Sequence, residues 1–334
     1  MQKFKIGIIG AGSIVETNHL PAIGAIPNAT VQWIFDSNTA RSQRVSKMYK
    51  IPVMQDQSVE KALEQVDICL LAIPYGVRRT YIDLCKNQAK ALLVEKPFAF
   101  SKSEHEGYCR GFAPWQIAVN FQRRFYHSVS VLQKIIREQV FGQLHSIHII
   151  QGNFTLKGGS GYLSNKSLAG GGVIAESAVH LLDILLLITR ATQLKVTSLR
   201  SLHREGLDYD TVFETDLVTL SENVSVYGEI STLRNLENGI HFKFENALVS
   251  CDLSPNGNIL IRENEKLRVN FLLKDEPEFS ELSSQATKIN ESFFIFWSQF
   301  LSGIENKREN LSSAFTSELT SAWLEAIYQK MDLS

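Results

Sequence analysis

The sequence lacks the features that would direct the chain to a membrane or to a nucleic acid. It contains no run of 18 apolar residues, and His180 and Asp183 interrupt the most apolar segment, Val179 to Ile188. The 34 basic and 35 acidic residues leave a net charge of -1. No run of lysine and arginine is long enough to bind a chain of phosphates. We therefore expect neither a membrane nor a nucleic acid as partner.

Cysteine is scarce as well, and its spacing excludes the usual cysteine chemistry. The four cysteines are scattered, and none forms a CxxC pair for zinc or dithiol chemistry. The chain enters a strand within five residues of its start, without the apolar stretch of a signal peptide. These observations predict no metal site and a cytoplasmic location.

Two patterns of secondary structure divide the 334 residues, a length that suits two domains. Over residues 1–121, short apolar strands alternate with amphipathic helices, which predicts an α/β domain with a doubly wound parallel sheet. Over residues 122–334, long strands and the hairpin signals Glu237-Asn-Gly239 and Pro255-Asn-Gly257 predict an α+β domain. Its sheet should be mostly antiparallel and open-faced, with the closing helices at 292–302 and 316–330 on one side.

The loop Gly10-Ala-Gly12 has the character of a dinucleotide site. It follows the first strand and opens a helix, so Gly10 permits a tight turn and Gly12 lets a pyrophosphate approach the helix N-terminus. The third glycine position of this fingerprint is Val15. Asp36 ends the second strand, where its carboxylate would bind a ribose diol and repel a 2′-phosphate. NAD is therefore the expected cofactor, although the nearby Arg41 leaves NADP possible.

Two further stretches place charged side chains where a ligand would lie. The buried strand Ala91 to Val94 runs directly into Glu95-Lys96-Pro97, and the carboxyl ends of parallel strands form the ligand crevice of such sheets. Pro97 disfavours a helical conformation at Lys96. The alternative is a solvated surface turn.

The second stretch is a helix that follows Gly170-Gly-Gly172. Glu176 and His180 are four residues apart and Asp183 lies three further on, so an α-helix would place all three on one face. Three glycines allow the backbone to approach another group closely. The alternatives are a solvated stripe on an amphipathic helix and a histidine held in the core.

Taken together, these residues resemble the Gfo/Idh/MocA family of NAD(P)-dependent oxidoreductases, which act mostly on sugars, inositols and nucleotide-sugars. The resemblance implies a Rossmann domain, an open-faced sheet domain and assembly as a homodimer or homotetramer. The family usually has Asp and Gly where this chain has Glu176 and Ala178, and Asn and His where it has Tyr75 and Arg78. The motifs that carry the resemblance are Gly10-Ala-Gly12 with His19-Leu-Pro-Ala22, Glu95-Lys96-Pro97, Asn120-Phe-Gln-Arg123-Arg-Phe125, the glycine-rich helix with His180 and Asp183, and Glu325-Ala-Ile-Tyr328.

The resemblance also implies the roles of individual residues in hydride transfer to or from a secondary alcohol of a sugar-like molecule. His180 would exchange the hydroxyl proton, Lys96 would stabilise the developing alkoxide, and Glu176 would orient His180 or bind a neighbouring hydroxyl. Glu95 would contact the nicotinamide ribose. The predicted cofactor contacts are Gly10, Gly12, Ser13, Ile14, Asp36, Ser37, Arg41, Ala72, Pro74, Tyr75, Glu95 and Lys96; the predicted substrate contacts are Lys96, Arg123, Tyr162, Asn165, Glu176 and His180.

Two other functions stay open from the sequence. One is a glycosidase-type enzyme of the same superfamily that keeps its NAD bound and uses it transiently. The other is a non-catalytic NAD(P)-binding regulator, which the replacement at Glu176 allows and the retained Lys96 and His180 oppose. For Arg123 and the loop from Tyr162 to Lys166, an ordinary surface position is the alternative to a substrate contact.

Overall fold

The computed structural model describes residues 2–55, 58–88, 90–155, 161–252, 254, 257–263, 267–271 and 289–332. The chain forms two compact units, and it enters each of them more than once. The sequence predicts a single boundary between residues 121 and 122. Unit 1 comprises Met1–Phe98, Ser103–Gln122 and Asp275–Ser317, and unit 2 comprises Ala99–Lys102, Arg123–Lys274 and Glu318–Ser334.

Unit 1 is built on a parallel five-stranded sheet with the strand order β2-β1-β3-β4-β5. The chain adds β2 on one side of β1 and then returns to add β3 on the other, so the strand order reverses beside β1. Strands β3, β4 and β5 are buried along their whole length, as expected of a parallel sheet covered on both faces. This confirms the predicted doubly wound sheet. The strands are β1 (Phe4–Ile9), β2 (Ala29–Phe35), β3 (Ile68–Leu71), β4 (Ala91–Val94) and β5 (Ile117–Val119).

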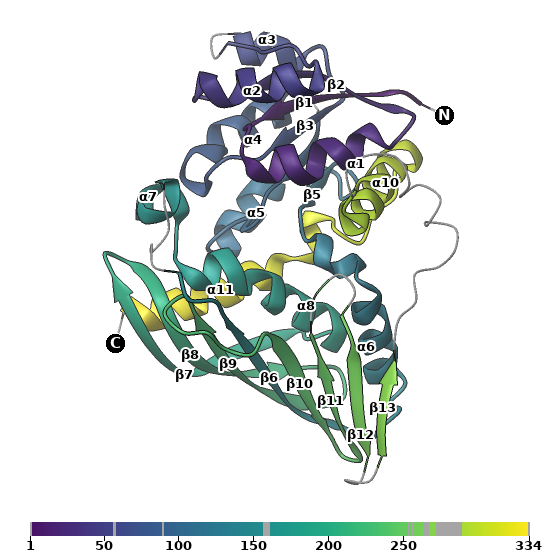
Figure 1. Ribbon diagram of the computed structural model, residues 1–334, viewed down its shortest axis with the longest axis vertical. Helices are drawn as coiled ribbons and strands as arrows, with labels where there is room; N and C mark the ends of the chain where they lie inside the picture. The colour runs from purple at the N-terminus through teal and green to yellow at the C-terminus, as the bar shows by residue number, and fades with distance from the viewer. Residues whose placement is uncertain are drawn as a thin grey trace. The chain divides into compact units, whose positions relative to one another are not determined.

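The helices of unit 1 include one from near the end of the chain. Helix α10 packs with this unit because Phe293 and Trp297 meet the His19 ring edge-on, at centroid distances of 5.0 and 5.9 Å. Helix α10 lies beside α1 in Figure 1. The helical elements are η1 (Val15–His19), α1 (Leu20–Gly24), α2 (Thr39–Tyr49), α3 (Val59–Leu63), η3 (Tyr75–Val77), α4 (Arg78–Asn87), α5 (Lys102–Cys109), α10 (Glu291–Asn306) and η8 (Ala314–Thr316).

Unit 2 is built on an eight-stranded sheet with the order β13-β12-β11-β10-β6-β9-β8-β7. Every neighbouring pair is antiparallel except β6 and β9, which run parallel. This confirms the predicted, mostly antiparallel sheet. Pro255 and Asn256 of the predicted turn before Gly257 lie outside the described residues. The strands are β6 (Leu144–Gly152), β7 (Gln193–Arg204), β8 (Leu207–Val218), β9 (Asn223–Ser231), β10 (Gly239–Phe244), β11 (Ala247–Cys251), β12 (Ile259–Glu263) and β13 (Leu267–Phe271).

Helices cover one face of this sheet (Figure 1). The helical run Lys166–Thr189 is long enough to span a membrane, and an 18-residue window within it has a mean hydropathy of 1.8. However, 78% of that window is buried inside the protein, as in the core helix of a globular domain. The sequence did not predict α6. The helical elements of unit 2, with η4 at its boundary, are η4 (Gln122–Phe125), α6 (His127–Arg137), η5 (Gly161–Ser164), α7 (Lys166–Ala169), η6 (Ile174–Ala178), α8 (Val179–Thr189) and α11 (Glu318–Asp332).

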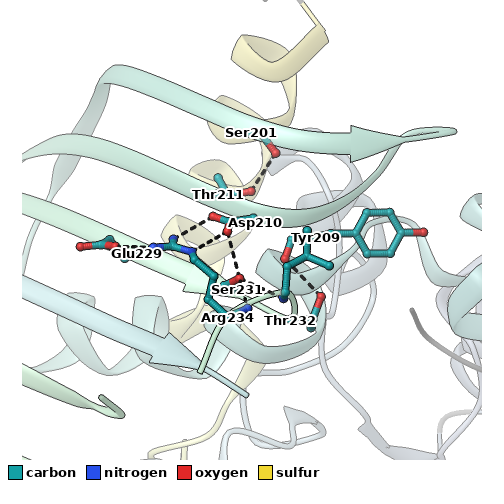
Figure 2. Close-up of polar contacts among 9 residues, drawn as sticks. Ser201, Tyr209, Asp210, Thr211, Glu229, Ser231, Thr232 and Arg234 are labelled. Carbon is teal, nitrogen blue, oxygen red and sulfur yellow. Dashed lines mark hydrogen bonds and ion pairs between the residues drawn. The ribbon is translucent and has the colours of Figure 1, made fainter. Parts of the chain in front are cut away.

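A side-chain ion-pair cluster ties β8 and β9 together beyond their backbone ladder (Figure 2). Arg234 donates from Nε and Nη2 to the two carboxylate oxygens of Asp210, at 2.6 and 2.9 Å, and from Nη1 to Glu229 at 3.2 Å. Ser231 Oγ also donates to Asp210, at 3.1 Å. The bidentate contact between Arg234 and Asp210 holds the segment after β9 against β8.

Candidate active site

The loop after β1 has the shape that a pyrophosphate requires. Gly10 has φ +107°, and a side chain there would overlap the carbonyl oxygen of Ala72. At Gly12, by contrast, no atom of the described residues lies within 4 Å of the position that a Cβ would take. The helix begins there, and Ser13 and Ile14, both exposed, are the first-turn residues whose amides a helix leaves without an intrahelical partner. The loop therefore fits an anionic group at Gly12.

Asp36 connects this loop to the end of β2. Its Oδ2 accepts from the Ala11 amide at 2.7 Å, and its Oδ1 accepts from the Asn38 amide at 2.8 Å. Asp36 is partly buried, whereas the neighbouring Ser37 and Arg41 are exposed. The carboxylate keeps lone pairs for a ribose diol while it also orders the glycine loop.

The predicted cofactor residues Ala72, Pro74 and Tyr75 follow β3 and lie partly buried at the same edge of the sheet. The Ala72 amide donates to Ile9 O at 2.8 Å, which places this segment directly beside the glycine loop. Tyr75 Oη donates to both carboxylate oxygens of Glu104, at 2.7 and 2.8 Å. Burial and the Glu104 carboxylate raise the pKa of the Tyr75 phenol, so it remains a hydrogen-bond donor at physiological pH.

Glu95 is the centre of a buried hydrogen-bond network at the end of β4. Its Oε1 accepts from His19 Nε2 at 2.8 Å and from Asn120 Nδ2 at 2.6 Å. Trp297 Nε1 donates to His19 Nδ1 at 3.0 Å, and because indole only donates, the histidine hydrogen must lie on Nε2 and point at Glu95. The sequence predicts a contact from Glu95 to the nicotinamide ribose; the structure gives this carboxylate an internal role in ordering its turn.

The charge of Glu95 is stabilised despite its burial. Burial alone would raise the pKa of the carboxyl, but the hydrogen bond from His19, the charge of Lys96 and the hydrogen bond from Asn120 outweigh it and lower the pKa. The orientation of the Asn120 amide is fixed, since a carboxylate can only accept. Its Oδ1 consequently points away from Glu95, and this buried atom has no partner among the described residues.

In unit 2, a buried aspartate holds the turn that precedes the helix with Glu176 and His180. Asp208 accepts from the amides of Gly172 and Ile174, at 2.8 and 2.9 Å, and from Tyr328 Oη at 2.8 Å. A side chain at Gly172 would overlap the Asp208 backbone, and one at Gly171 would overlap the Tyr328 hydroxyl. The glycines are therefore required by a close approach within unit 2, which the sequence predicted without naming the partner.

The helix itself differs from the predicted continuous α-helix. Residues Ile174–Ala178 form a π-helical turn that leads into α8 (Val179–Thr189). Glu176 is partly buried and His180 is 6% exposed. Asp183 lies deeper, at 1% exposure, and accepts from Arg124 Nε and Nη2 at 2.7 and 2.5 Å. Asp183 thus holds α8 in the core of unit 2. Of the three predicted polar residues on this helix, Glu176 and His180 are left as candidate catalytic residues.

The remaining predicted substrate residues lie in different environments within unit 2. Arg123 precedes the paired Arg124, and desolvation by burial lowers the pKa of its guanidinium. Tyr162 is 42% exposed. Asn165 is exposed and caps α7, with Oδ1 accepting from the Ser167 amide at 2.9 Å. Asn165 is therefore used locally, and Arg123 is the most buried of these three candidates.

Three residues that build these sites were absent from the predicted set: Asn120, Asp208 and Trp297. Asn120 and the Glu325–Tyr328 helix carried a motif signal, but Asp208 and Trp297 lie in segments with no distinctive spacing. Within the described ranges, no group of three or more His, Cys, Asp or Glu side chains is placed to hold a metal ion.

The parallel sheet, its glycine loop and the carboxylate after β2 define a dinucleotide-binding Rossmann domain. Residues 4–110 match the family model described as "Oxidoreductase family, NAD-binding Rossmann fold", that of Gfo/Idh/MocA. The N-terminal domain thus belongs to this family, which confirms the resemblance found in the motifs. The predicted class, an NAD(P)-dependent oxidoreductase, agrees with the description of this family.

Individual relatives are more distant. A dTDP-3,4-didehydro-2,6-dideoxy-alpha-D-glucose 3-reductase of Streptomyces antibioticus is 21% identical over 150 residues, which are 43% of this chain and 45% of that protein. The chain spans about half the length of the curated relatives it matches.

Solved structures match over nearly the whole chain. An aldose-aldose oxidoreductase from Caulobacter crescentus, complexed with glycerol, superposes with a TM-score of 0.82 at 15% identity, over 99% of this chain and 98% of that one. A 3-ketoreductase from Actinomadura kijaniata, in complex with NADP and TDP-benzene, superposes with a TM-score of 0.80 at 15% identity, over 98% of both chains. At this identity the likeness shows the fold alone.

Proposed function

We propose that the protein transfers a hydride between a nicotinamide cofactor and a secondary alcohol or ketone of a sugar, cyclitol or nucleotide-sugar. The observation that carries the proposal is the match of residues 4–110 to an NAD-binding oxidoreductase family, together with a glycine loop whose geometry fits a pyrophosphate. The names of the relatives, a nucleotide-sugar reductase and an aldose oxidoreductase, support the substrate class.

Three side chains are assigned to the chemistry. The cofactor supplies or accepts the hydride when it is bound. Lys96, at the carboxyl end of β4, donates to the substrate oxygen and stabilises its developing negative charge. His180 exchanges the hydroxyl proton, and Glu176, one turn earlier, orients the imidazole or binds a neighbouring hydroxyl.

The reaction is tested by following NAD and NADP reduction, and NADH and NADPH oxidation, across sugars, inositols and nucleotide-sugars. Lys96→Ala should lower turnover about 10²-fold or more, while NADH binding changes much less. His180→Ala should lower turnover and alter the acidic limb of its pH profile. Normal turnover by the Lys96→Ala, His180→Ala double variant would refute the assignment.

Glu176→Asp separates the two roles of Glu176. If Glu176 only orients His180, the shorter side chain should cost little activity, whereas a substrate that needs the longer reach should be turned over more slowly. A reaction with no net change in NAD would instead favour the glycosidase-type enzyme. A chain that binds NADH and turns over nothing in the panel would favour the regulator.

The proposed cofactor preference is NAD over NADP. It rests on Asp36, whose carboxylate accepts hydrogen bonds from a diol and repels a phosphate. Fluorescence titration should give a smaller dissociation constant for NADH than for NADPH, and Asp36→Ser should narrow the difference. Tighter NADPH binding by the natural chain would overturn this proposal and would point to the exposed Arg41 as a phosphate ligand.

Assembly and location complete the proposal. A homodimer or homotetramer formed through the open face of the unit 2 sheet is expected, and light scattering that shows a monomer at micromolar concentration would count against it. A cytoplasmic location is proposed because the chain holds only four cysteines, whose side chains are all buried.

A further inference from the structure

Arg78 is a buried arginine with no assigned role, and it lies at the carboxyl ends of two neighbouring strands. It is the first residue of α4 and is 2% exposed. Its Nη2 donates to Ile73 O, which follows β3, at 3.1 Å. Its Nη1 donates to Glu95 O, which follows β4, at 2.9 Å, and also to Pro97 O. One guanidinium therefore joins the two strand-end loops.

One nitrogen atom of Arg78 binds the carbonyl group before Lys96 and the carbonyl group of the residue after it. Since the carbonyl of Glu95 belongs to the peptide before Lys96 and that of Pro97 lies just beyond it, neither peptide can rotate without breaking a hydrogen bond to Arg78. Between Ala91 and Ala99, Lys96 is the one residue that is partly exposed, and all the others are buried. Arg78 therefore restrains the backbone before and after Lys96, the one partly exposed side chain of this stretch.

The side chain before Lys96 is fixed from another direction. The Glu95 carboxylate accepts from His19 and Asn120, so the turn is held by its carbonyl oxygens and by its acidic side chain at once. An ammonium could reach one or two carbonyls, but the planar guanidinium can bind acceptors that diverge from its edge. Removing either set of contacts would leave the turn held on one side only.

The stability of α4 gives no reason for a cation at this place. Positive charge is unfavourable near a helix N-terminus, and Arg78 is the first residue of its helix. Burial of a guanidinium adds a desolvation cost. The contacts with the strand-end loops are the feature that explains an arginine there.

We propose that Arg78 is a positioning residue that sets the direction of the Lys96 side chain by holding the carbonyl groups of Glu95 and Pro97. The inference rests on the proposed function, in which Lys96 acts on the substrate oxygen. A displacement of about 1 Å in a catalytic group can cost about 10²-fold in rate, so a loosened turn should affect turnover more than binding.

The first experiment measures turnover in Arg78→Lys and Arg78→Ala, with whichever sugar the natural chain converts. The constant kcat should fall about 10- to 100-fold, while KM and the NADH dissociation constant change less than kcat. Guanidinium chloride at a non-denaturing concentration should restore part of kcat in Arg78→Ala and none in Arg78→Lys. The matched control is Arg79→Lys, since Arg79 is the exposed neighbour on the same helix and should leave kcat unchanged.

The second experiment needs no substrate and therefore separates this inference from the proposed function. Acetic anhydride labels lysine side chains, and mass spectrometry gives the rate at Lys96 relative to the exposed Lys47 of α2. The relative rate at Lys96 should rise in Arg78→Lys and stay constant in Arg79→Lys. Should Arg78→Ala fail to fold, Arg78→Lys carries both tests. The inference would be overturned if Arg78→Lys left the acetylation rate at Lys96 relative to Lys47 unchanged. It would also be overturned if Arg78→Lys had the same kcat as the natural chain.

Discussion

Unit 1 and unit 2 each contain a candidate functional turn that is ordered by a buried charged side chain, and the two charges are of opposite sign. In unit 1, the Arg78 guanidinium gathers the carbonyl oxygens of Ile73, Glu95 and Pro97. In unit 2, the Asp208 carboxylate gathers the amides of Gly172 and Ile174 together with the Tyr328 hydroxyl. The sign follows from the backbone: the strand-end loops of unit 1 offer carbonyl groups, whereas a helix start offers amides.

The two units nevertheless use one local device. In each, a glycine-containing turn leads into a π-helical turn, η1 after Gly12 and η6 after Gly172. In each, a carboxylate from a neighbouring strand or loop accepts an amide of the turn, Asp36 at Ala11 and Asp208 at Gly172. π-Helical turns are rare and concentrate at functional sites, so their presence at both turns supports these as the functional positions.

The largest expected effect tests the close approach in unit 2. In Gly172→Ala, the new methyl group would overlap the Asp208 backbone, so the turn must move, and we expect a loss of about 3 kcal/mol in the free energy of unfolding. Urea denaturation measures it. The control is Gly24→Ala, where no described atom lies within 4 Å of the new Cβ. Equal stability of the two variants would show that the turn tolerates displacement.

The next effect tests the acceptor in unit 2. The two carboxylate oxygens of Asp208 accept from the amides of Gly172 and Ile174. Asp208→Asn replaces one of these oxygens with an NH₂ group, which cannot accept, so one backbone amide loses its partner. We expect a loss of about 2 kcal/mol in unfolding free energy. Tyr328→Phe removes one hydrogen bond at the same carboxylate and should cost about 1 kcal/mol. Denaturant titration of both single variants and the double variant gives their coupling. Additive losses would contradict a shared network, because residues of one network should couple.

The third effect tests the balance of charge in unit 1. Asn120→Asp replaces a donor 2.6 Å from Glu95 with a second acceptor, so two carboxylates then share one site. Their combined pKa should rise, and the destabilisation should be present at neutral pH and shrink as pH falls through that raised pKa. Thermal unfolding at pH 8 and pH 5 measures it, with Asn120→Ser as the control. A destabilisation independent of pH would contradict repulsion.

The natural chain should show the opposite trend at Glu95, since the pKa of this carboxyl is lowered in the folded state. A carboxyl group whose pKa is lower in the folded than in the unfolded state stabilises the protein at pH values above its ordinary pKa of about 4.3. That stabilisation is lost as the pH falls through the lowered pKa of the folded state. Glu95→Gln should therefore lose less stability than the natural chain between pH 5 and pH 3. Parallel acid-unfolding curves would contradict this charge state.

The smallest effect concerns the sheet of unit 2. Burial, and the charge of the neighbouring His241, lower the pKa of His148, against an opposing effect of Glu229. The folded state thus disfavours the protonated imidazole, and stability should fall as pH drops below about 6.5 and level off below the lowered pKa. His148→Gln should flatten this part of the Tm profile slightly. A steeper profile in the variant would show that protonation stabilises the sheet.

The sequence predicted the elements well where a pattern was local. Strand β4 with its Glu95-Lys96-Pro97 turn, the glycine loop of unit 1 and the carboxylate after β2 all follow from short-range spacing. The mostly antiparallel sheet was predictable because strand alternation is also a local signal. The hairpin predicted at Glu237-Asn-Gly239 was wrong, since β9 and β10 on either side of it are separated in the sheet by β6.

The parts that escaped prediction depend on contacts between distant residues. Asp208 meets Tyr328 120 positions later, and Trp297 meets His19 278 positions earlier, so no spacing rule connects them. Asp183 shares a predicted polar stripe with His180, and only its ion pair with Arg124 reveals that it is a core residue. The prediction that Glu176, His180 and Asp183 share one face assumed an α-helix. The π-helical turn η6 has more residues per turn, so it changes the directions in which these side chains point.

The contact between Trp297 and His19 has a consequence for the order in which the protein is made. Trp297 closes the buried network of the first sheet, yet it is translated after all the strands of both sheets that the structure describes. While the ribosome is still adding residues, a chain whose five parallel strands have already emerged lacks the indole that fixes the His19 tautomer and, through it, the Glu95 turn. The dinucleotide-binding unit therefore reaches its native state late in synthesis, and a fragment that ends at residue 121 would keep the glycine loop but lack the group that completes its core.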